Sequence, residues 1–295
     1  MSAALSRHGD AQPNSDVTQS ASPRDNSSGP KRKRLIVDSQ VHIWKANTPE
    51  RPWAKGLKPQ LPEPFTIERL VSMMDEAGVD RAIIVPPRLD RLRIDYAQEA
   101  VRRYPERFAI MAPIALDDVQ APNRIANWKD QPGVLGIRLN IKPTTVGEKF
   151  AWLSDGTADW FWPAAKQADI PVMILTRGQV ARLASIAERH PQLTLIIDHM
   201  GVSLHEVRNN SVAAAIEQTL SLAKYPNVSV KLSSSPRLSS ELYPFRDVAP
   251  YIQHLVDAFG PQRCHWGTDI THSLAMASYA QRITQFTEEL PFLSE

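Results

Sequence analysis

This 295-residue sequence predicts an α/β fold, namely a (β/α)8 or TIM barrel that covers about residues 35–295. Three observations support this prediction. Eight short apolar runs, often β-branched, recur along this part of the chain. Segments with the 3.6-residue apolar period of a helix separate them. No Gly-x-Gly-x-x-Gly pattern follows the first run, which weighs against an open doubly wound sheet. Alternating strands and helices favour parallel pairing, and closure into a barrel removes both sheet edges.

The predicted strands are short and apolar, as expected of strands that are covered by protein on both faces. In chain order they are Leu35–Trp44, Arg81–Pro86, Phe108–Leu116, Leu135–Ile141, Pro171–Arg177, Leu193–His199, Val228–Ser233 and Cys264–Asp269. Apolar residues on one face predict helices between them, and Gly78 after the first helix is a candidate C-cap. These helices are Thr66–Ala77, Val180–His190, Ser211–Lys224, Val248–Phe259 and Met276–Leu290.

The composition is that of a globular protein, with 42% hydrophobic and 22% charged residues. A net charge of +2 argues against a nucleic-acid binder, which usually carries a strong basic excess. The single Cys264 excludes an intrachain disulfide framework and fits a reducing compartment, so we expect a cytoplasmic protein. No apolar run reaches the length that crosses a membrane. A homo-oligomer is left open by these data.

Residues 1–33 differ in composition from the rest of the chain. They are rich in Ser, Asn, Asp, Gln and Pro, and we expect them to form a disordered polar leader ahead of a barrel domain at 34–295. The basic cluster at 31–34 is followed by only three apolar residues, which is too few for an export signal. We interpret the cluster as a solvated junction.

Polar residues gather where the predicted strands end, which is where a barrel of this kind carries its active site. Asp38, Gln40 and His42 alternate along the first strand and therefore project to one side. Taken singly, each has a structural alternative, such as a core histidine for His42 or an ion-pair partner for Arg138. Together they favour a site. The full set is Gln40, His42, Trp44, Arg138, Asn140, Thr176, Arg177, Asp198, His199, Lys231, Arg237, Asp269 and His272.

These residues stand in motifs that resemble a known family. The motifs are Asp38-Ser-Gln-Val-His-Ile-Trp44, Gly136-Ile-Arg138, Asp198-His-Met-Gly201, Lys231-Leu-Ser-Ser-Ser-Pro-Arg237 and Gly267-Thr-Asp269. In this order they resemble the amidohydrolase-related barrels that include 2-pyrone-4,6-dicarboxylate lactonase and fuconolactonase. The resemblance covers about residues 35–295.

The resemblance implies a role for several residues. Asp269 matches a general base that activates water, and His199 and His42 match histidines that polarise the scissile carbonyl. Arg138 and Arg237 match positions that hold substrate carboxylates, a task suited to the planar guanidinium fork. We place Gln40, Trp44, Arg177 and His272 with them on the substrate-binding side.

Gln40 departs from the family pattern, because the first of two strand-1 histidines is missing. An amide is a poor zinc ligand, so the sequence favours a site without metal or other cofactor. The alternative is one divalent ion such as zinc, held by His42, His199 and Asp269.

Hydrolysis of a lactone by Asp269-activated water is the leading functional hypothesis, on a polar or anionic small molecule. Two alternatives stay open. One is a metal-dependent amide hydrolase or non-oxidative decarboxylase of the same superfamily, and the other is a non-catalytic barrel that binds a small molecule.

Overall fold

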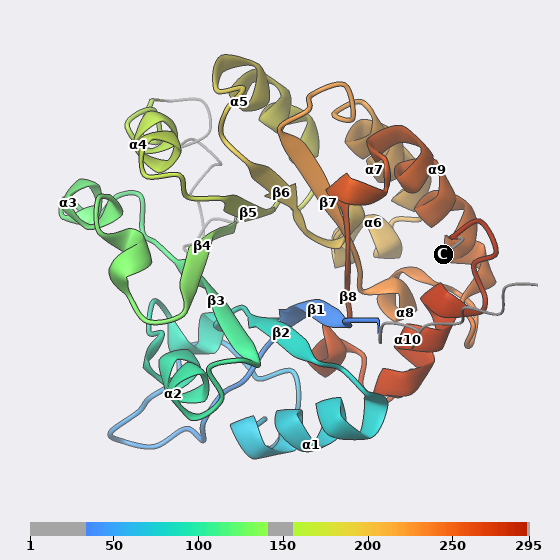
Figure 1. Ribbon diagram of the computed structural model, residues 1–295, viewed down its shortest axis with the longest axis horizontal. Coiled ribbons are helices and arrows are strands. Elements are labelled where there is room, and N and C mark those ends of the chain that lie inside the picture. Colours follow the sequence, from blue (N-terminus) through green and yellow to red (C-terminus); the bar gives the residue numbers. More distant parts are fainter. Residues whose placement is uncertain (1–33, 141–155, 294–295) are drawn as a thin grey trace, which may run out of the picture. The chain divides into compact units, whose positions relative to one another are not determined.

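The computed structural model of the protein describes residues 34–140 and 156–293, and it confirms the predicted barrel (Figure 1). Its eight strands follow the order β1 to β8, and each pairs in parallel with the next. The described residues from Leu35 onward form one compact unit. The predicted leader at 1–33 and Ile141, the last residue of the predicted fourth strand, lie outside the described residues.

Every predicted strand is present, and most are shorter than expected at the carboxyl end. The strands are β1 Val37–Val41, β2 Arg81–Ile84, β3 Phe108–Pro113, β4 Val134–Asn140, β5 Val172–Leu175, β6 Leu195–Ile197, β7 Val228–Ser233 and β8 Cys264–Gly267. After β6 and β8 the chain turns into short 3₁₀ segments, η5 Asp198–Gly201 and η8 Ile270–His272. The polar residues expected at strand ends therefore stand on turns above the barrel.

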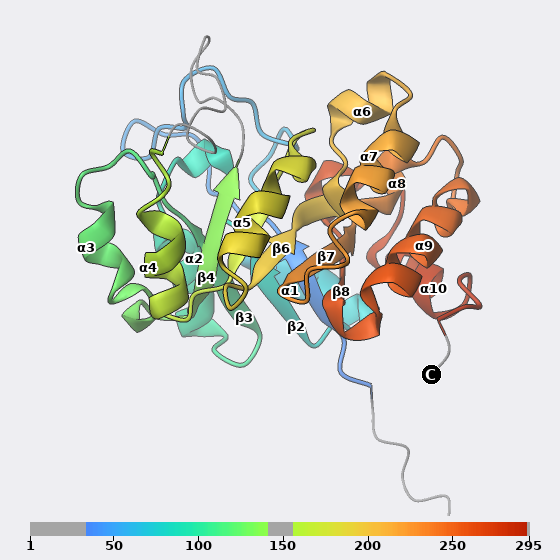
Figure 2. The same cartoon turned by 90° about the horizontal axis from the view of Figure 1, so that it is seen from above.

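Helices surround the strands, as the end-on and side views show (Figures 1 and 2). They are α1 Ile67–Ala77, α2 Asp95–Arg103, α3 Ala121–Ile125, α4 Phe161–Gln167, α5 Leu183–Arg189, α6 Leu204–Arg208, α7 Val212–Leu220, α8 Ser235–Leu238, α9 Ala249–Phe259 and α10 Tyr279–Thr287. The predicted helices do not include α2, α3, α4, α6 or α8. The buried face of α2 includes Ala97 and Ala100 and gives a weak apolar signal. Among the described residues, each helix falls short of what a membrane span requires.

The seam between β1 and β8 closes the barrel through the buried carboxylate of Asp38. This carboxylate accepts hydrogen bonds from the backbone N–H of Gln40 (2.9 Å), the N–H of Thr268 (2.9 Å), the Thr268 hydroxyl and the Tyr279 hydroxyl (2.7 Å). One step further along, the N–H of Asp269 donates to the Gln40 carbonyl at 2.9 Å. The seam thereby sets Gln40 and His42 beside Asp269.

Close packing at this seam leads to a first prediction. A methyl group on Gly267 would lie 2.6 Å from Ser39 Oγ and 3.2 Å from the backbone nitrogen of Gln40. We expect Gly267→Ala to lower the free energy of unfolding by about 1–3 kcal/mol, because overpacking forces the two strands apart. Urea unfolding measures the loss.

Ser39→Ala supplies the control, because Ser39 Oγ is buried and has no hydrogen-bond partner among the described residues. The double variant Ser39→Ala/Gly267→Ala should regain part of the lost stability. A Gly267→Ala protein as stable as the wild type would contradict this account of the seam.

Candidate active site

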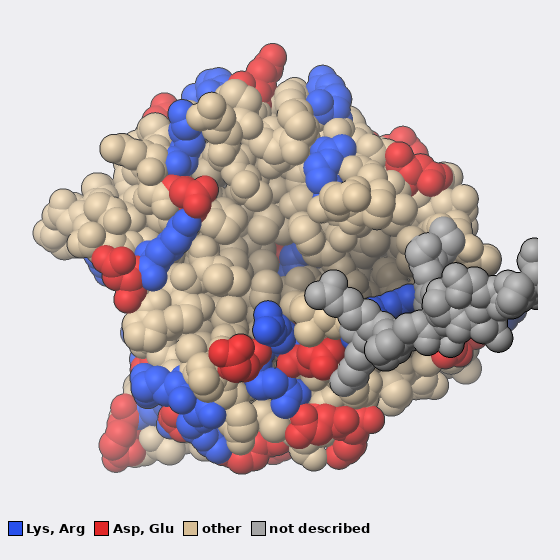
Figure 3. Space-filling view, in the orientation of Figure 1, with Lys and Arg blue, Asp and Glu red and all other residues tan. Residues whose placement is uncertain are grey.

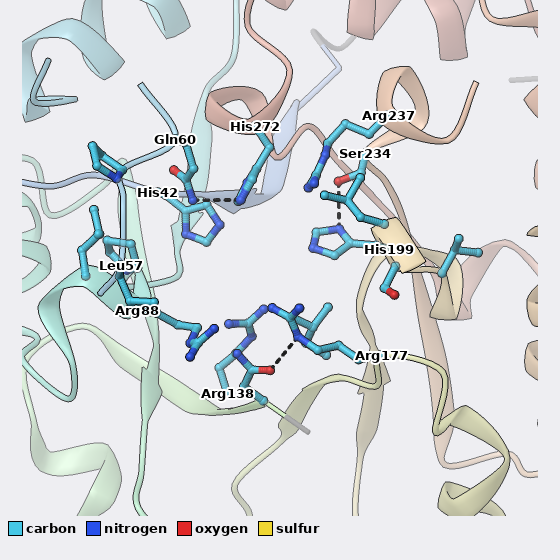
Figure 4. A pocket seen from close by; sticks show the side chains of 18 of the residues that line it. His42, Leu57, Gln60, Arg88, Arg138, Arg177, His199, Ser234, Arg237 and His272 are labelled. Atoms are coloured by element: carbon cyan, nitrogen blue, oxygen red, sulfur yellow. Dashed lines mark hydrogen bonds between the residues drawn. The ribbon is translucent and has the colours of Figure 1, made fainter. Parts of the chain in front are cut away.

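A cavity of about 380 Å³ lies at the carboxyl ends of the strands, a volume within the range of small-molecule sites (Figure 4). None of its described lining residues is acidic, and several are cationic. The polar lining residues are His42, Lys58, Gln60, Arg88, Arg138, Asn140, Arg177, His199, Ser203, Ser234, Arg237 and His272. Such a lining favours a polar or negatively charged ligand.

The carboxylate of Asp269 lies directly beneath this cavity and has no exposed surface. It accepts hydrogen bonds from His272 Nδ1 at 2.8 Å and from the Ser234 hydroxyl at 2.7 Å. His42 Nε2 stands 3.2 Å from its Oδ1, and Arg237 Nη1 stands 3.5 Å from its Oδ2. Burial alone would raise the pKa of Asp269, but the neighbouring histidines hold it well below its usual range. The group is therefore a carboxylate at neutral pH.

Four residues at strand ends adopt the left-handed backbone conformation, which is rare outside glycine. They are Arg177 (φ 44°), His199 (φ 52°), Ser234 (φ 67°) and Asp269 (φ 51°). They follow β5, β6, β7 and β8 respectively. Each such residue costs about 1–3 kcal/mol, and strain of this kind gathers at functional sites. Of these four residues, Arg177, His199 and Ser234 line the cavity, and Asp269 accepts a hydrogen bond from the Ser234 hydroxyl.

His42 is held by hydrogen bonds that assign its ring protons. Its Nδ1 lies 2.6 Å from the carbonyl oxygen of Val85, which can only accept, so Nδ1 carries the proton. In the neutral ring Nε2 then presents a lone pair. The side-chain nitrogen of Gln40 lies 3.3 Å from this Nε2 and donates to it.

Gln40 is in turn oriented by a buried cation. Lys231 Nζ can only donate, and it donates to Gln40 Oε1, which turns the amide nitrogen of Gln40 toward His42. Lys231 also pairs with Asp198 at 3.1 Å, and Arg138 Nε donates to the other Asp198 oxygen at 3.2 Å. Burial would raise the pKa of Asp198, but Lys231 and Arg138 lower it to about 2.

His199 is held through its Nδ1 by two serines. Its Nδ1 lies 2.8 Å from Ser233 Oγ and 3.1 Å from Ser234 Oγ. Because the Ser234 hydroxyl gives its proton to Asp269, it must accept from His199, and the ring proton is therefore on Nδ1. Burial lowers the pKa of His199 to about 4, so the ring is neutral at pH 7. His199 Nε2 then carries a lone pair, 3.9 Å from Asp269 Oδ2.

His272 connects Asp269 to the segment between β1 and α1. Its Nδ1 bonds Asp269, and its Nε2 lies 3.0 Å from the side-chain nitrogen of Gln60. Leu57, Lys58 and Gln60 of that segment line the cavity. His272, expected to bind substrate, thus lines the cavity and also fixes Asp269.

Four arginines reach the cavity from different parts of the barrel. Arg88 follows β2, Arg138 lies on β4, Arg177 follows β5, and Arg237 lies on α8. Burial, together with the charges of Arg88, Arg138 and Arg237, lowers the pKa of Arg177 to about 10. Burial and the charge of Arg138 also lower the pKa of Arg88.

Two residues that we expected to contact the substrate, Trp44 and Gln40, do not line the cavity. Trp44 is fully buried and stacks on Phe65, with ring centroids 5.8 Å apart, because the chain leaves the barrel there and pairs with Phe65. Gln40 lies beneath the cavity floor and is fully buried. Neither is a lining residue, so we correct the expectation that they face the substrate.

The sequence interpretation missed three residues at this site, namely Arg88, Ser234 and Gln60. Arg88 follows β2 within a few residues, so the strand-end rule would have found it. Ser234 stands in a run of three serines, and nothing in that run marks the one that bonds Asp269. Gln60 lies far from any strand end and carries no local signal.

The sequence model of the amidohydrolase family matches residues 37–295. The chain belongs to the amidohydrolase family. The resemblance seen in its motifs is thereby confirmed.

Curated relatives of this amidohydrolase are lactone hydrolases. It is 25% identical over 238 residues to an L-fucono-1,5-lactonase of Burkholderia ambifaria, with 79% of each chain covered. It is 28% identical over 240 residues to a 4-sulfomuconolactone hydrolase of Hydrogenophaga intermedia, covering 80% of this chain and 74% of the relative. The fold resembles a solved amidohydrolase of Burkholderia multivorans, with a TM-score of 0.70 at 21% identity over 87% of this chain and 91% of that chain. The protein is an enzyme, a hydrolase, and the non-catalytic alternative is set aside.

The residues present in this amidohydrolase suit a divalent cation poorly. One ligand atom from each of His42, Asp269 and His272 lies within 4.8 Å of the others, so His272 takes the place expected for His199. The surroundings, however, are hydrogen-bond donors. The Gln40 amide nitrogen points at the lone pair of His42, and the Arg237 guanidinium stands 3.5 Å from Asp269. The first group donates to a would-be ligand atom of His42, and the second places a guanidinium beside the other oxygen of the Asp269 carboxylate.

The neutral state of His199 predicts how stability depends on pH. Burial lowers the pKa of His199 from 6.5 to about 4, so its contribution is fully present above pH 6.5 and is lost as the pH falls toward 4. In that window the free energy of unfolding should fall by up to about 1 kcal/mol per pH unit more in the wild type than in His199→Asn. Urea unfolding at a series of pH values measures the slope.

Asparagine is chosen because it tolerates the left-handed conformation of position 199. His254→Asn, on the exposed side of α9, is the matched control and should leave the wild-type slope unchanged. Equal slopes for His199→Asn and the wild type would contradict the assignment of a buried neutral ring.

Proposed function

We propose that this amidohydrolase opens a lactone of a polar or anionic small molecule by direct attack of water, without a metal or other cofactor. The observation that carries the proposal is the buried carboxylate of Asp269. Four cavity-lining side chains surround it, those of His42, Ser234, Arg237 and His272. Relatives that are named lactonases support the same reaction class, and one of them is named for a sulfonated lactone.

Asp269 acts as the general base. His199 Nε2 stands 3.9 Å and Arg237 Nη1 stands 3.5 Å from Asp269 Oδ2, separations too long for strong direct hydrogen bonds. After a small side-chain rotation, a water between these groups can donate one hydrogen to Asp269 and the other to the lone pair of His199. That geometry leaves an oxygen lone pair of the water free to attack the lactone carbonyl. His199 therefore orients the water, a different role from the carbonyl polarisation that the family resemblance implies.

Arg237 polarises the carbonyl. Its guanidinium lines the cavity beside Asp269, so it can donate to the oxygen on which negative charge develops. Neutral His199, with its ring proton on Nδ1, has no proton on Nε2 to give. When the ring C–O bond breaks, the proton taken from water passes from Asp269 to the departing ring oxygen. The product is the open-chain hydroxy acid.

The metal-dependent alternatives, amide hydrolysis and non-oxidative decarboxylation, would rest on His42, Asp269 and His272 as ligands. The donor groups of Gln40 and Arg237 weigh against them, because both point at would-be ligand atoms. Lys231, which donates a hydrogen bond to Gln40, adds a positive charge beneath the floor of the cavity.

Replacing the base tests the proposal. We expect Asp269→Asn to lower kcat for lactone hydrolysis by about 10²–10⁴-fold, since an amide cannot take a proton from water. A pH-stat assay with L-fucono-1,5-lactone and 4-sulfomuconolactone measures the rates.

Asp257→Asn, on the exposed side of α9, is the matched control and should retain the wild-type rate. Circular dichroism establishes that both variants are folded. A folded Asp269→Asn protein with the wild-type kcat would refute Asp269 as the base.

A further inference from the structure

We propose that Gln60 is a positioning residue that keeps the ring proton of His272 on the nitrogen facing Asp269. This role rests on the proposed lactone hydrolysis and adds to it a residue from the segment between β1 and α1, which no motif marked. Gln60 lines the cavity, and Figure 4 shows its amide joined to the His272 ring by a hydrogen bond. Gln60 acts through His272 on the base and does not need to touch the reacting atoms.

The two ring nitrogens of His272 face partners of opposite kind. Its Nδ1 lies 2.8 Å from Asp269 Oδ1, which can only accept, so Nδ1 carries a proton. Its Nε2 lies 3.0 Å from the side-chain nitrogen of Gln60, which can only donate, so Nε2 presents a lone pair. One neutral tautomer satisfies both contacts. In the other neutral tautomer an N–H would face the amide N–H, and a lone pair would face the carboxylate.

The position of the His272 ring is set by other contacts, so what Gln60 determines is the location of the proton. The backbone N–H of His272 donates to the Asp269 carbonyl at 3.0 Å. The ring packs edge-on against His42, with centroids 5.4 Å apart and an interplanar angle of 74°. Neither contact selects which ring nitrogen is protonated. The bonds to Gln60 and Asp269 do, because each engages a different ring nitrogen.

This proton matters because His272 holds one oxygen of the Asp269 carboxylate. The contact from His272 Nδ1 to Oδ1 is 2.8 Å, shorter than the 3.2 Å contact from His42 Nε2 to the same oxygen. Ser234 bonds the other oxygen, Oδ2, at 2.7 Å. With both oxygens bonded, the carboxylate keeps one orientation for the proton transfer from water. A base that is held in its productive orientation lowers the barrier of the chemical step.

The segment that carries Gln60 is attached to the barrel on either side of this residue. Leu57 and Leu61 pack against the hydrophobic core, and Arg51 pairs with Asp95 at 2.6 Å. Pairs of opposite charge are an ordinary feature of this surface, since Lys and Arg lie beside Asp and Glu around the edge of the face in Figure 3. These contacts hold the backbone near Gln60, and they leave the direction of its amide open.

A single hydrogen bond orients the amide of Gln60. Its Oε1 is buried and has no hydrogen-bond partner among the described residues. A buried acceptor without a partner costs free energy, and an apolar side chain of the same shape would pack here without that cost. Packing alone therefore does not account for an amide at position 60, whereas the bond to His272 does.

The chemical shifts of the His272 ring nitrogens, measured by nuclear magnetic resonance, test this role first. In the wild type at pH 7 we expect a protonated Nδ1 and an unprotonated Nε2. Gln60→Met keeps the length of the side chain without the donor, so the Nε2 shift should change as its hydrogen bond is lost. Gln60→Glu presents an acceptor and should place a proton on Nε2. His272→Asn identifies the His272 signals by their absence.

Lactone hydrolysis supplies the second readout. We expect Gln60→Met to lower kcat about 3–10-fold, the effect of one lost hydrogen bond, and to leave KM near the wild-type value. A loss in kcat and kcat/KM together marks an interaction that acts in the transition state. Gln253→Met, on the exposed side of α9, is the matched control and should leave both the rates and the ring shifts unchanged. Circular dichroism establishes that each variant is folded.

The outcomes for Gln60 and for the proposed function are distinguishable, because the ring shifts require no substrate. The expected shifts in a protein that opens no lactone would support the bond from Gln60 to His272 and overturn the function. Ring shifts that are the same in Gln60→Met, Gln60→Glu and the wild type would overturn the role of Gln60. A Gln60→Met protein with a lowered Tm and the wild-type kcat would also overturn it, since that result is expected of a purely structural residue.

Discussion

The buried carboxylate of Asp269 is the charge around which the carboxyl end of the barrel is arranged. It stands after the last strand, and the β1–β8 seam brings it to Gln40 and His42 at the start of the chain. Donors from Ser234 and His272 satisfy it, so it stays ionised despite full burial. A buried carboxylate without such partners would be protonated and could not act as a base.

A second buried charge, that of Lys231, orients the side chains beneath the cavity. Lys231 sits in the barrel interior, paired with Asp198 and hydrogen-bonded to Gln40. A pair of this kind contributes little net stability, but removing one partner leaves the other charge uncompensated. Here the pair also has a directional consequence, because it orients an amide that presents a donor to His42. The glutamine that the sequence marked as a lost metal ligand is therefore part of a buried hydrogen-bond network.

Much of this arrangement could be predicted from the sequence, and the reasons for the rest are physical. Apolar runs located all eight strands, and the strand-end rule found Asp269, His199 and His42. The left-handed turns at His199 and Asp269, which decide where those side chains point, carry no sequence signal because neither residue is glycine. Trp44 followed the rule but packs on Phe65, since the chain turns away from the barrel there. Ring protons depend on partners distant in sequence, as with His42 and Val85, and only a structure supplies those.

Metal content is the measurement that tests the central claim most directly, namely that Asp269 activates water without a metal. The protein is purified without chelators or added metal, analysed by inductively coupled plasma mass spectrometry, and assayed for lactone hydrolysis before and after dialysis against a chelator. The account predicts far less than one metal ion per chain and a rate that dialysis leaves unchanged. Near-stoichiometric zinc or manganese, with activity lost on chelation and restored by that metal, would contradict it and establish His42, Asp269 and His272 as a metal centre.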